Sequence, residues 1–153
     1  MTVILRRLDH VAVVVRSTES ALAYFRDRLG LAVVSSEEIE SSGVRLTYLD
    51  CGNAYLQLVE PLDPDTEIAR FLEGSGEGIH HVCFGVDDVP DAVARLSEDG
   101  APTRLGSGRG RVSAFLTGPV RHGVRVECTE FRREEDIDGR AGWLRGASEE
   151  PGG

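Results

Sequence analysis

The 153-residue chain has a formal net charge of −9, with 41% hydrophobic and 28% charged residues. This length and composition indicate one globular domain, and the acidic balance argues against nucleic acid or an anionic membrane as the main partner. All 17 basic residues are arginine, which excludes chemistry that needs a lysine, such as Schiff-base formation or a lysine-type P-loop.

Three cysteines, Cys51, Cys83 and Cys128, lie in short apolar runs without CxxC spacing. An odd number of cysteines and no signal-peptide pattern predict reduced thiols in a cytoplasmic protein, with the cysteines acting as small buried side chains. No apolar run approaches the length that spans a membrane.

The first half of the chain predicts a strand, a helix and three further strands. Continuous apolar character over residues 8–15 predicts a strand covered on both faces. A hydroxyl cap at Thr18 and an acid in the first turn predict a helix that ends at Gly30. Strands are then predicted at 31–39, 43–50 and 54–60, between Ser-, Gly- and Asn-containing turns.

The second half repeats this order after a connector, residues 62–76, with a short helix that begins near Thr66. Asp88 predicts a helix cap with Pro90 in the first turn, and Gly100 ends this helix. The Gly-rich segment around Arg109 and Arg111 predicts either a lid over a site or a solvated turn. The strands of this half are predicted at 79–86, 101–105, 111–117 and 123–130.

The two halves place polar residues at matching positions. His10 and His81 open equivalent apolar strands 71 positions apart, Gln57 follows His10 by 47 positions, and Glu127 follows His81 by 46. Each of these residues alone is typical of an ordinary polar strand residue, but the matched spacing favours one duplicated module with a shared site.

The repeat predicts an α+β fold of two βαβββ modules, residues 6–61 and 77–131, in one domain over residues 1–131. If the modules form one curved sheet, the faces that carry the four matched residues converge. Two imidazoles, an amide oxygen and a carboxylate suit a six-coordinate divalent ion and leave two positions for a bidentate substrate. His80, out of phase with the repeat, is predicted to face the other way from His81. His122 is predicted to lie in a turn, either solvated or at the mouth of a cavity. The charged segment 132–153 is predicted to be a partly disordered tail.

The chain resembles the vicinal oxygen chelate superfamily, and within it the methylmalonyl-CoA epimerases. This resemblance implies a partly open eight-stranded mixed sheet around one divalent metal ion (Co, Mn, Zn, Ni, Mg or Fe), held by His10, Gln57, His81 and Glu127, and commonly a homodimer. It covers roughly residues 8–131 and is carried by the segments Leu8-Asp9-His10-Val11-Ala12, Tyr24 to Leu31, Gly52 to Leu62, Ile68 to Leu72, Gly78-Ile79-His80-His81-Val82 and Gly123 to Glu127.

The resemblance also implies a reaction. The family chelates a substrate through two oxygens and stabilises the enolate left when the proton α to a carbonyl is removed, and its epimerases use a base on each side of the substrate. Glu127 resembles one base. The other is a glutamate two residues before the glycine that matches Gly43, where this chain has Ser41, so the neighbouring Glu40 is the expected replacement.

An acyl-CoA is the substrate that the resemblance implies, although the segment that often follows the seventh strand, similar to His-Pro-Lys, is absent. Arg109 or Arg121 is then the expected source of phosphate contacts. Three other functions remain open: a lyase or isomerase acting on a natural-product intermediate, which Ser41 favours; a non-catalytic binding or resistance protein; and a ferrous dioxygenase with His10, His81 and Glu127 as a facial triad, which Gln57 disfavours.

Overall fold

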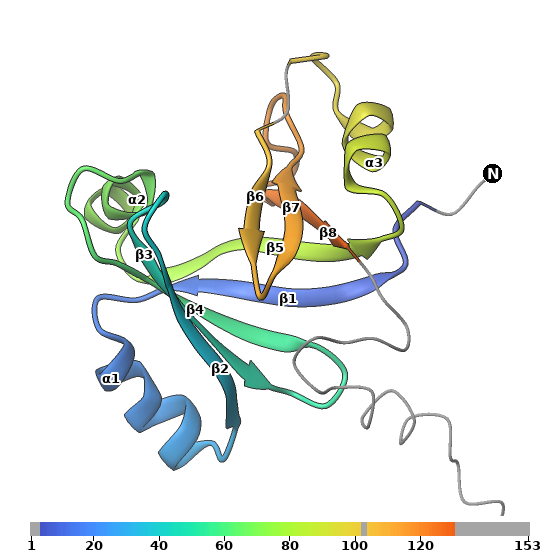
Figure 1. Ribbon diagram of the computed structural model, residues 1–153. Helices are drawn as coiled ribbons and strands as arrows, with labels where there is room; N and C mark the ends of the chain where they lie inside the picture. Colours follow the sequence, from blue (N-terminus) through green and yellow to red (C-terminus); the bar gives the residue numbers. More distant parts are fainter. Residues whose placement is uncertain (1–3, 102–103, 131–153) are drawn as a thin grey trace, which may run out of the picture.

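The computed structural model describes residues 4–101 and 104–130, so the predicted tail at 132–153 lies outside the described residues. Two units of similar order follow one another, with helix α2 between them (Figure 1). The elements are β1 (Arg7–Val14), α1 (Thr18–Leu22), the π-helix η1 (Ala23–Arg28), β2 (Ala32–Ile39), β3 (Val44–Asp50), β4 (Tyr55–Pro61), α2 (Glu67–Ser75), β5 (Gly78–Val86), α3 (Val89–Leu96), β6 (Gly106–Gly108), β7 (Arg111–Phe115) and β8 (Val126–Glu130).

All eight strands form one sheet in the order β2-β3-β4-β1-β5-β8-β7-β6. Strands β1 and β5, the first of each unit, pair antiparallel at its centre and run side by side through the middle of Figure 1. Each also pairs in parallel with the last strand of its own unit, β1 with β4 and β5 with β8. The predicted α+β fold of two βαβββ modules in a mixed eight-stranded sheet is therefore confirmed.

Residue parity in β4 separates the two faces of the first module. Leu58 packs in a cluster with Phe25 and other side chains of α1 and η1, while Val59, one residue later, packs in a cluster with Phe71 of α2. Successive side chains of a strand point to opposite faces, so Gln57 lies on the same face as Val59, away from α1.

The second module follows the same rule. Cys128 of β8 packs against Val89 and Val93 of α3, so Glu127 and Thr129 point to the opposite face of the sheet. The helices α1 and α3 thus cover one face of their modules, and the polar strand residues Gln57 and Glu127 are turned to the other face. Burial of Cys83 and Cys128 agrees with the prediction for these thiols, whereas Cys51 is exposed.

Two irregularities interrupt the central β1–β5 ladder, one on each strand. In β1 the register shifts between Leu8 and His10, and in β5 one residue, His80, is passed over between the partners of Val13 and Ala12. A bulge brings neighbouring side chains closer to one side than regular alternation allows. The prediction that His80 faces away from His81 is therefore wrong: their Nδ1 atoms lie 2.7 Å apart.

The segment around Arg109 also differs from the prediction. Of the predicted strand 101–105, the described residues form no strand, and β6 begins instead at Gly106 in a tight hairpin with β7. Arg109 and Arg111 are 8% and 2% exposed, so of the two predicted alternatives the solvated turn is wrong. Gly-rich composition was misleading here because the glycines permit close packing as well as mobility.

The helix caps follow the sequence closely. Thr66 and Asp88 accept hydrogen bonds from the backbone N–H groups of Ala69 and Asp91, as N-caps of α2 and α3. In α1 the cap is Ser17 rather than Thr18, one residue earlier than predicted. Helix α3 ends earlier than predicted, at Leu96 instead of near Gly100.

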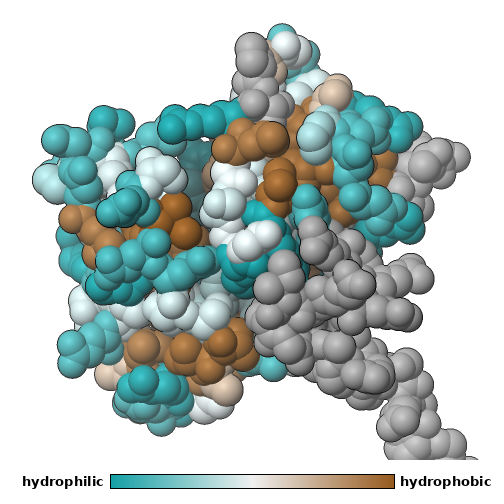
Figure 2. Space-filling model, viewed as in Figure 1, coloured by the Kyte–Doolittle hydropathy of each residue, from teal (hydrophilic) through white to brown (hydrophobic). Residues whose placement is uncertain are grey.

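The face of the molecule seen in Figure 2 is largely hydrophilic, with hydrophobic residues in separate groups between charged ones. Within the described residues, no helix combines the length and apolar character needed to cross a membrane.

Gly43 offers a test of the turn between β2 and β3. Its φ is +61°, and an added Cβ would lie 2.8 Å from Thr66 Cγ2. We expect Gly43→Ala to lower the free energy of unfolding by about 1–3 kcal/mol, because it adds backbone strain and a clash. Gly30→Ala is the matched control, since Gly30 has φ +82° but no atom within 4 Å of an added Cβ. Urea denaturation measures the free energy of unfolding of both variants. An equal decrease in the two would show that the contact with Thr66 adds no destabilisation.

Candidate functional site

Three of the predicted ligands meet at one point on the face of the sheet turned away from α1 and α3. The Nε2 atoms of His10 on β1 and His81 on β5 lie 3.4 Å apart, and each is 3.4 Å from Oε1 of Glu127 on β8. Atoms bound to one divalent ion at about 2.1 Å lie roughly 3.0–3.5 Å from one another. The three donor atoms are therefore spaced for a common cation.

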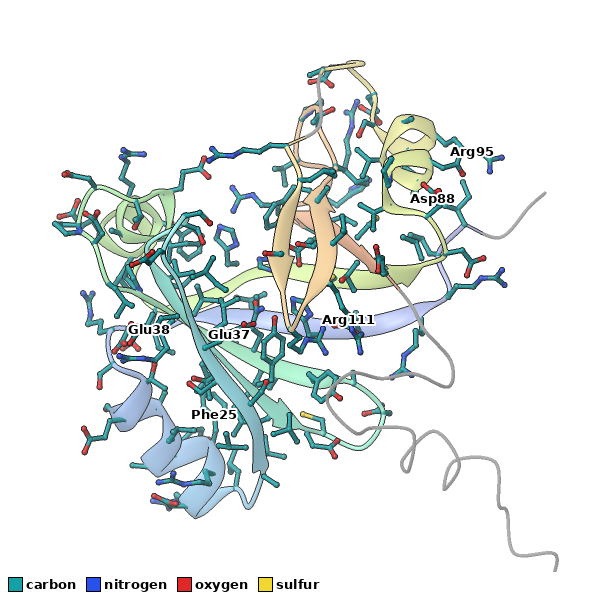
Figure 3. The ribbon with its side chains drawn as sticks, in the orientation of Figure 1. Phe25, Glu37, Glu38, Asp88, Arg95 and Arg111 are labelled. Atoms are coloured by element: carbon teal, nitrogen blue, oxygen red, sulfur yellow. The ribbon has the colours of Figure 1, made fainter. Side chains whose placement is uncertain are left out.

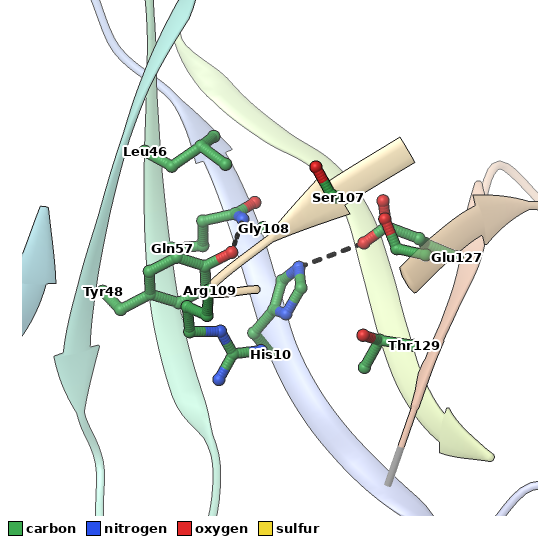
Figure 4. Close-up of a pocket in the computed structure, with 10 residues that line it drawn as sticks. His10, Leu46, Tyr48, Gln57, Ser107, Gly108, Arg109, Glu127 and Thr129 are labelled. Atoms are coloured by element: carbon green, nitrogen blue, oxygen red, sulfur yellow. Dashed lines mark hydrogen bonds and ion pairs between the residues drawn. The ribbon is translucent and has the colours of Figure 1, made fainter. Parts of the chain in front are cut away.

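Gln57 is the fourth predicted ligand, and it lines the same pocket as His10 and Glu127. Its side-chain Nε2 donates a 2.6 Å hydrogen bond to Oη of Tyr48 (Figure 4). Its Oε1 is buried and has no hydrogen-bond partner among the described residues. A buried amide oxygen without a partner is costly, so this oxygen fits the role of a cation ligand.

The pocket contains about 290 Å³ of empty space, part of it open to solvent. Figure 4 shows the first module on one side of it and the second module on the other. His81 is not among the lining residues, but it contacts two of them, His10 and Glu127. The lining is formed by His10, Leu46, Tyr48, Gln57, Ser107, Gly108, Arg109, Ser113, Glu127 and Thr129.

Asp9 fixes the orientation of His10. Its Oδ2 lies 2.7 Å from Nδ1 of His10 and accepts a second hydrogen bond of 2.5 Å from Nη2 of Arg109. When His10 is neutral, a proton on Nδ1 that is donated to Asp9 leaves the lone pair on Nε2, the atom that faces Glu127. His10 therefore presents the nitrogen that a cation requires.

On the other side of the site, His81 contacts His80, and Nε2 of His80 lies 2.6 Å from Nη1 of Arg125. Burial, with the nearby His81 and Arg125, lowers the pKa of His80 to about 3. Burial also lowers the pKa of His81, although Glu127 opposes this. Both imidazoles are therefore neutral near pH 7, and neutral imidazole is the form that binds metal ions.

The buried carboxylates are anionic. Burial opposes their charge, but for Asp9 the hydrogen bond from His10 and the charge of Arg109 outweigh it and lower the pKa. Hydrogen bonds from His10 and His81 likewise lower the pKa of Glu127. Burial opposes a charge on His10 as well, yet Asp9 and Glu127 together raise its pKa. Taken with the unpartnered oxygen of Gln57, the donor set fits a divalent ion.

The second predicted base is not at this site. Glu40 and Ser41 are exposed in the turn between β2 and β3 and do not line the pocket. The half-buried carboxylate of the same strand is Glu37, which is cross-strand neighbour to the pocket residue Leu46. Arg121, named as a phosphate contact, is exposed and paired with Glu98 at 2.7 Å.

The sequence reasoning missed two residues that surround the ligands, Asp9 and Tyr48, and it gave Arg109 and Arg111 other roles, in a lid or solvated turn and as a phosphate contact. Asp9 had a signal, because a carboxylate next to a ligating histidine often orients it. Tyr48 shares a strand face with Leu46, so alternation placed it toward Gln57 once the strand pairing was known. Arg109 and Arg111 gave no usable signal, because nothing local shows that the hairpin tip reaches Asp9 of the other module.

With this geometry established, comparison with known proteins gives the family. The model of the Glyoxalase/Bleomycin resistance protein/Dioxygenase superfamily matches residues 9–115. The chain belongs to this superfamily. The predicted membership of the vicinal oxygen chelate proteins is therefore confirmed, and the duplicated βαβββ sheet is the fold of its structural neighbours.

Among its relatives, an ethylmalonyl-CoA/methylmalonyl-CoA epimerase of Cereibacter sphaeroides is 38% identical over 109 residues, which cover 71% of this chain and 81% of that protein. An uncharacterised Bacillus subtilis protein is 31% identical, covering 86% of this chain and 96% of its own. The methylmalonyl-CoA epimerase of Streptomyces coelicolor, solved as a variant in complex with 2-nitronate-propionyl-CoA, has a TM-score of 0.72 and 31% identity, covering 82% of this chain and 97% of that one. These similarities support an epimerase-like enzyme.

The buried charges predict how the stability of the metal-free protein depends on pH. Lowered pKa values at Asp9 and Glu127 give stability that is present above the ordinary carboxyl range of about 4 and is lost as pH falls. The raised pKa of His10 gives stability that is present below about 6.5 and is lost as pH rises through the folded-state pKa. The lowered pKa values of His80 and His81 act in the other direction: they give stability that is present above about 6.5 and is lost as pH falls. The metal-free protein is therefore most stable at about pH 6.5.

Asp9→Asn tests this assignment. We expect it to lower the free energy of unfolding near pH 6 by about 3–5 kcal/mol, because it leaves buried donors without their carboxylate. The loss of stability below pH 4 also becomes shallower. Denaturant titrations at several pH values measure both effects, with Asp27→Asn as the control, since Asp27 is an exposed partner of Arg26. An acid limb that keeps its slope in Asp9→Asn would contradict the role of Asp9.

Proposed function

We propose that this protein is a divalent-metal-dependent enzyme that transfers a proton α to a carbonyl, with an acyl-CoA such as methylmalonyl-CoA as substrate. The observation that carries the proposal is the convergence of His10, His81 and Glu127, with mutual donor distances of 3.4 Å, beside the unpartnered Oε1 of Gln57. The epimerases among its relatives support the reaction and the substrate class. A homodimer and a cytoplasmic location remain predictions.

A bound divalent ion supplies Lewis-acid stabilisation of the negative charge that develops on a carbonyl oxygen. His10 and His81 are held in place by Asp9 and His80, so the site does not need to reorganise when charge develops. Gln57 contributes a neutral oxygen, which leaves the site more positive than a second carboxylate would. Such a site favours an enolate over the neutral substrate.

Glu127 is the proposed base for one side of the substrate. It is the sole carboxylate in the lining of the described pocket, and its lowered pKa keeps it ionised near pH 7. Ser107 and Ser113 line the pocket on the side of the second module and present hydroxyl groups that can bind an oxygen of the substrate.

Glu40 remains the proposed second base, and it requires the turn between β2 and β3 to move, because its side chain is exposed. The presence of a single carboxylate in the pocket lining favours a second candidate function. This is an isomerase or lyase that acts on a natural-product intermediate: one base removes the α-proton, and then either the proton is returned to another carbon or a leaving group departs.

The metal site is tested with single ligand variants. We expect Gln57→Ala and His81→Ala each to weaken metal binding by more than the roughly 10–100-fold that loss of an outer hydrogen-bond partner costs, while circular dichroism shows the native fold. Isothermal titration with Mn²⁺ and Co²⁺ measures the affinity, and His122→Ala, in an exposed turn, is the control. Variants that keep stoichiometric, tightly bound metal would end the assignment.

The reaction is tested with methylmalonyl-CoA in deuterated water. We expect α-deuterium to enter the substrate when the protein carries a suitable divalent ion, because the proton passes through an exchangeable base. No incorporation with Co²⁺, Mn²⁺, Mg²⁺, Zn²⁺ or Ni²⁺ would remove the proposal.

The configuration of the recovered thioester separates the two candidates. Inversion with deuterium indicates a base on each side, whereas deuterium with retained configuration indicates one base. Glu40→Gln then decides the second base, since unchanged inversion in this variant would exclude Glu40. Glu38→Gln is the matched control, because Glu38 is an exposed carboxylate near the end of β2 that pairs with Arg45.

A further inference from the structure

Arg109 occupies an unusual position at the tip of the β6–β7 hairpin. Its φ is +56°, a backbone conformation that residues other than glycine seldom adopt. Its backbone N–H donates a 2.6 Å hydrogen bond to Oε1 of Glu37 on β2. Since β2 and β6 are the two edge strands of the sheet, this bond links its edges. Arg111 follows Arg109 at the start of β7. Figure 3 shows Glu37 and Arg111 near the centre of the view, where the modules meet.

The approach of the hairpin depends on Gly108. An added Cβ at this position would lie 3.1 Å from Oη of Tyr48 and 3.7 Å from Oε1 of Glu37. A larger residue would therefore push the hairpin away from the first module. The strained backbone of Arg109 and the missing side chain of Gly108 together bring the Arg109 side chain into the site. Backbone strain of this kind persists where the surrounding structure enforces it.

The guanidinium of Arg109 contacts two residues that hold ligands of the first module. Nη2 donates to Oδ2 of Asp9 at 2.5 Å, and the same oxygen lies 2.7 Å from Nδ1 of His10. The guanidinium carbon also lies 4.3 Å from the centre of the Tyr48 ring, within the range of a cation–π contact. Tyr48 in turn accepts the hydrogen bond of Gln57.

We propose that Arg109 is a positioning residue for the metal site: one side chain of the second module orients His10 through Asp9 and Gln57 through Tyr48. The proposal rests on the metal site of the proposed function and adds to it. Without Arg109, the Asp9 carboxylate and the Tyr48 ring each lose a contact that limits their rotation. The ligands that they hold then lose their fixed orientation.

Simple electrostatics makes the opposite prediction. Arg109 is a positive charge near the site, and removal of a nearby cation strengthens the binding of a second cation when geometry is unchanged. If Arg109 positions the ligands, its removal weakens metal binding, even though it also removes the repulsion between Arg109 and the metal ion. The sign of the change in affinity separates the two effects.

The test uses Arg109→Met, which keeps most of the side-chain length and removes the charge and the planar group. We expect the Kd for Co²⁺ and Mn²⁺ to rise about 10–100-fold, with a native circular dichroism spectrum. We also expect the visible absorption of the Co²⁺-loaded protein to change in intensity, because ligand geometry sets it. A Kd equal to or lower than that of the wild type would overturn the proposal.

Arg111→Met is the matched control. Arg111 is a second buried arginine, and its Nη1 lies 3.7 Å from the other oxygen of Asp9, so the change removes a similar charge without removing the contact to the oxygen that faces His10. We expect its Kd to rise less than that of Arg109→Met and its Co²⁺ spectrum to change less, because its contact with Asp9 is longer. An equal rise of the Kd in both variants would mean that loss of buried charge, rather than positioning, weakens the site, and would overturn the proposal.

Arg109→Lys keeps the test decisive if the methionine variant does not fold. Lysine retains the charge beside Asp9 but has no planar group to lie against Tyr48. We expect a several-fold higher Kd and a Co²⁺ spectrum between those of the wild type and Arg109→Met. A wild-type Kd and spectrum in the lysine variant would overturn the role assigned to the Tyr48 contact. A wild-type protein that binds neither ion would overturn the proposed metal function instead.

Discussion

The site depends on the antiparallel pairing of β1 with β5, the one ladder that joins the two modules directly at the centre of the sheet. His10 and His81 lie on these two strands, and the ladder brings their Nε2 atoms to 3.4 Å. The parallel partners β4 and β8 then add Gln57 and Glu127, one from each module. Neither module alone contains more than two of the four residues, so the complete site requires both.

Bringing these groups together places several charges in the interior. Asp9 and Glu127 are anionic and buried, and burial of a carboxylate is tolerated only when it is paired and hydrogen-bonded. His10 lies between the two carboxylates, and Arg109 neutralises Asp9 from the other module. The charge left for a cation to balance is that of Glu127, whose pKa is lowered by hydrogen bonds with His10 and His81 against the effect of burial.

Much of this arrangement was predictable because the chain is duplicated. Matched spacing of His10 with Gln57 and of His81 with Glu127 placed the four residues on equivalent strands, and strand parity then turned them to one face. The failures are of one kind. The faces of Asp9 and His80 depend on bulges in the β1–β5 ladder, and the burial of Arg109 depends on a contact with the opposite module, so neither is encoded in local periodicity.

The chain of contacts behind His81 limits how a cation can enter. A guanidinium only donates, so Nε2 of His80 accepts from Arg125, and a neutral His80 must then carry its proton on Nδ1 and donate it to Nδ1 of His81. The remaining proton of His81 therefore lies on Nε2, toward Glu127. Coordination through that nitrogen requires the proton to move to Nδ1, which reverses the bond to His80 and leaves its Nε2 protonated. Arg125 and a cation on His81 thus compete through His80, whereas His10 can bind through Nε2 while its Nδ1–H stays hydrogen-bonded to Asp9.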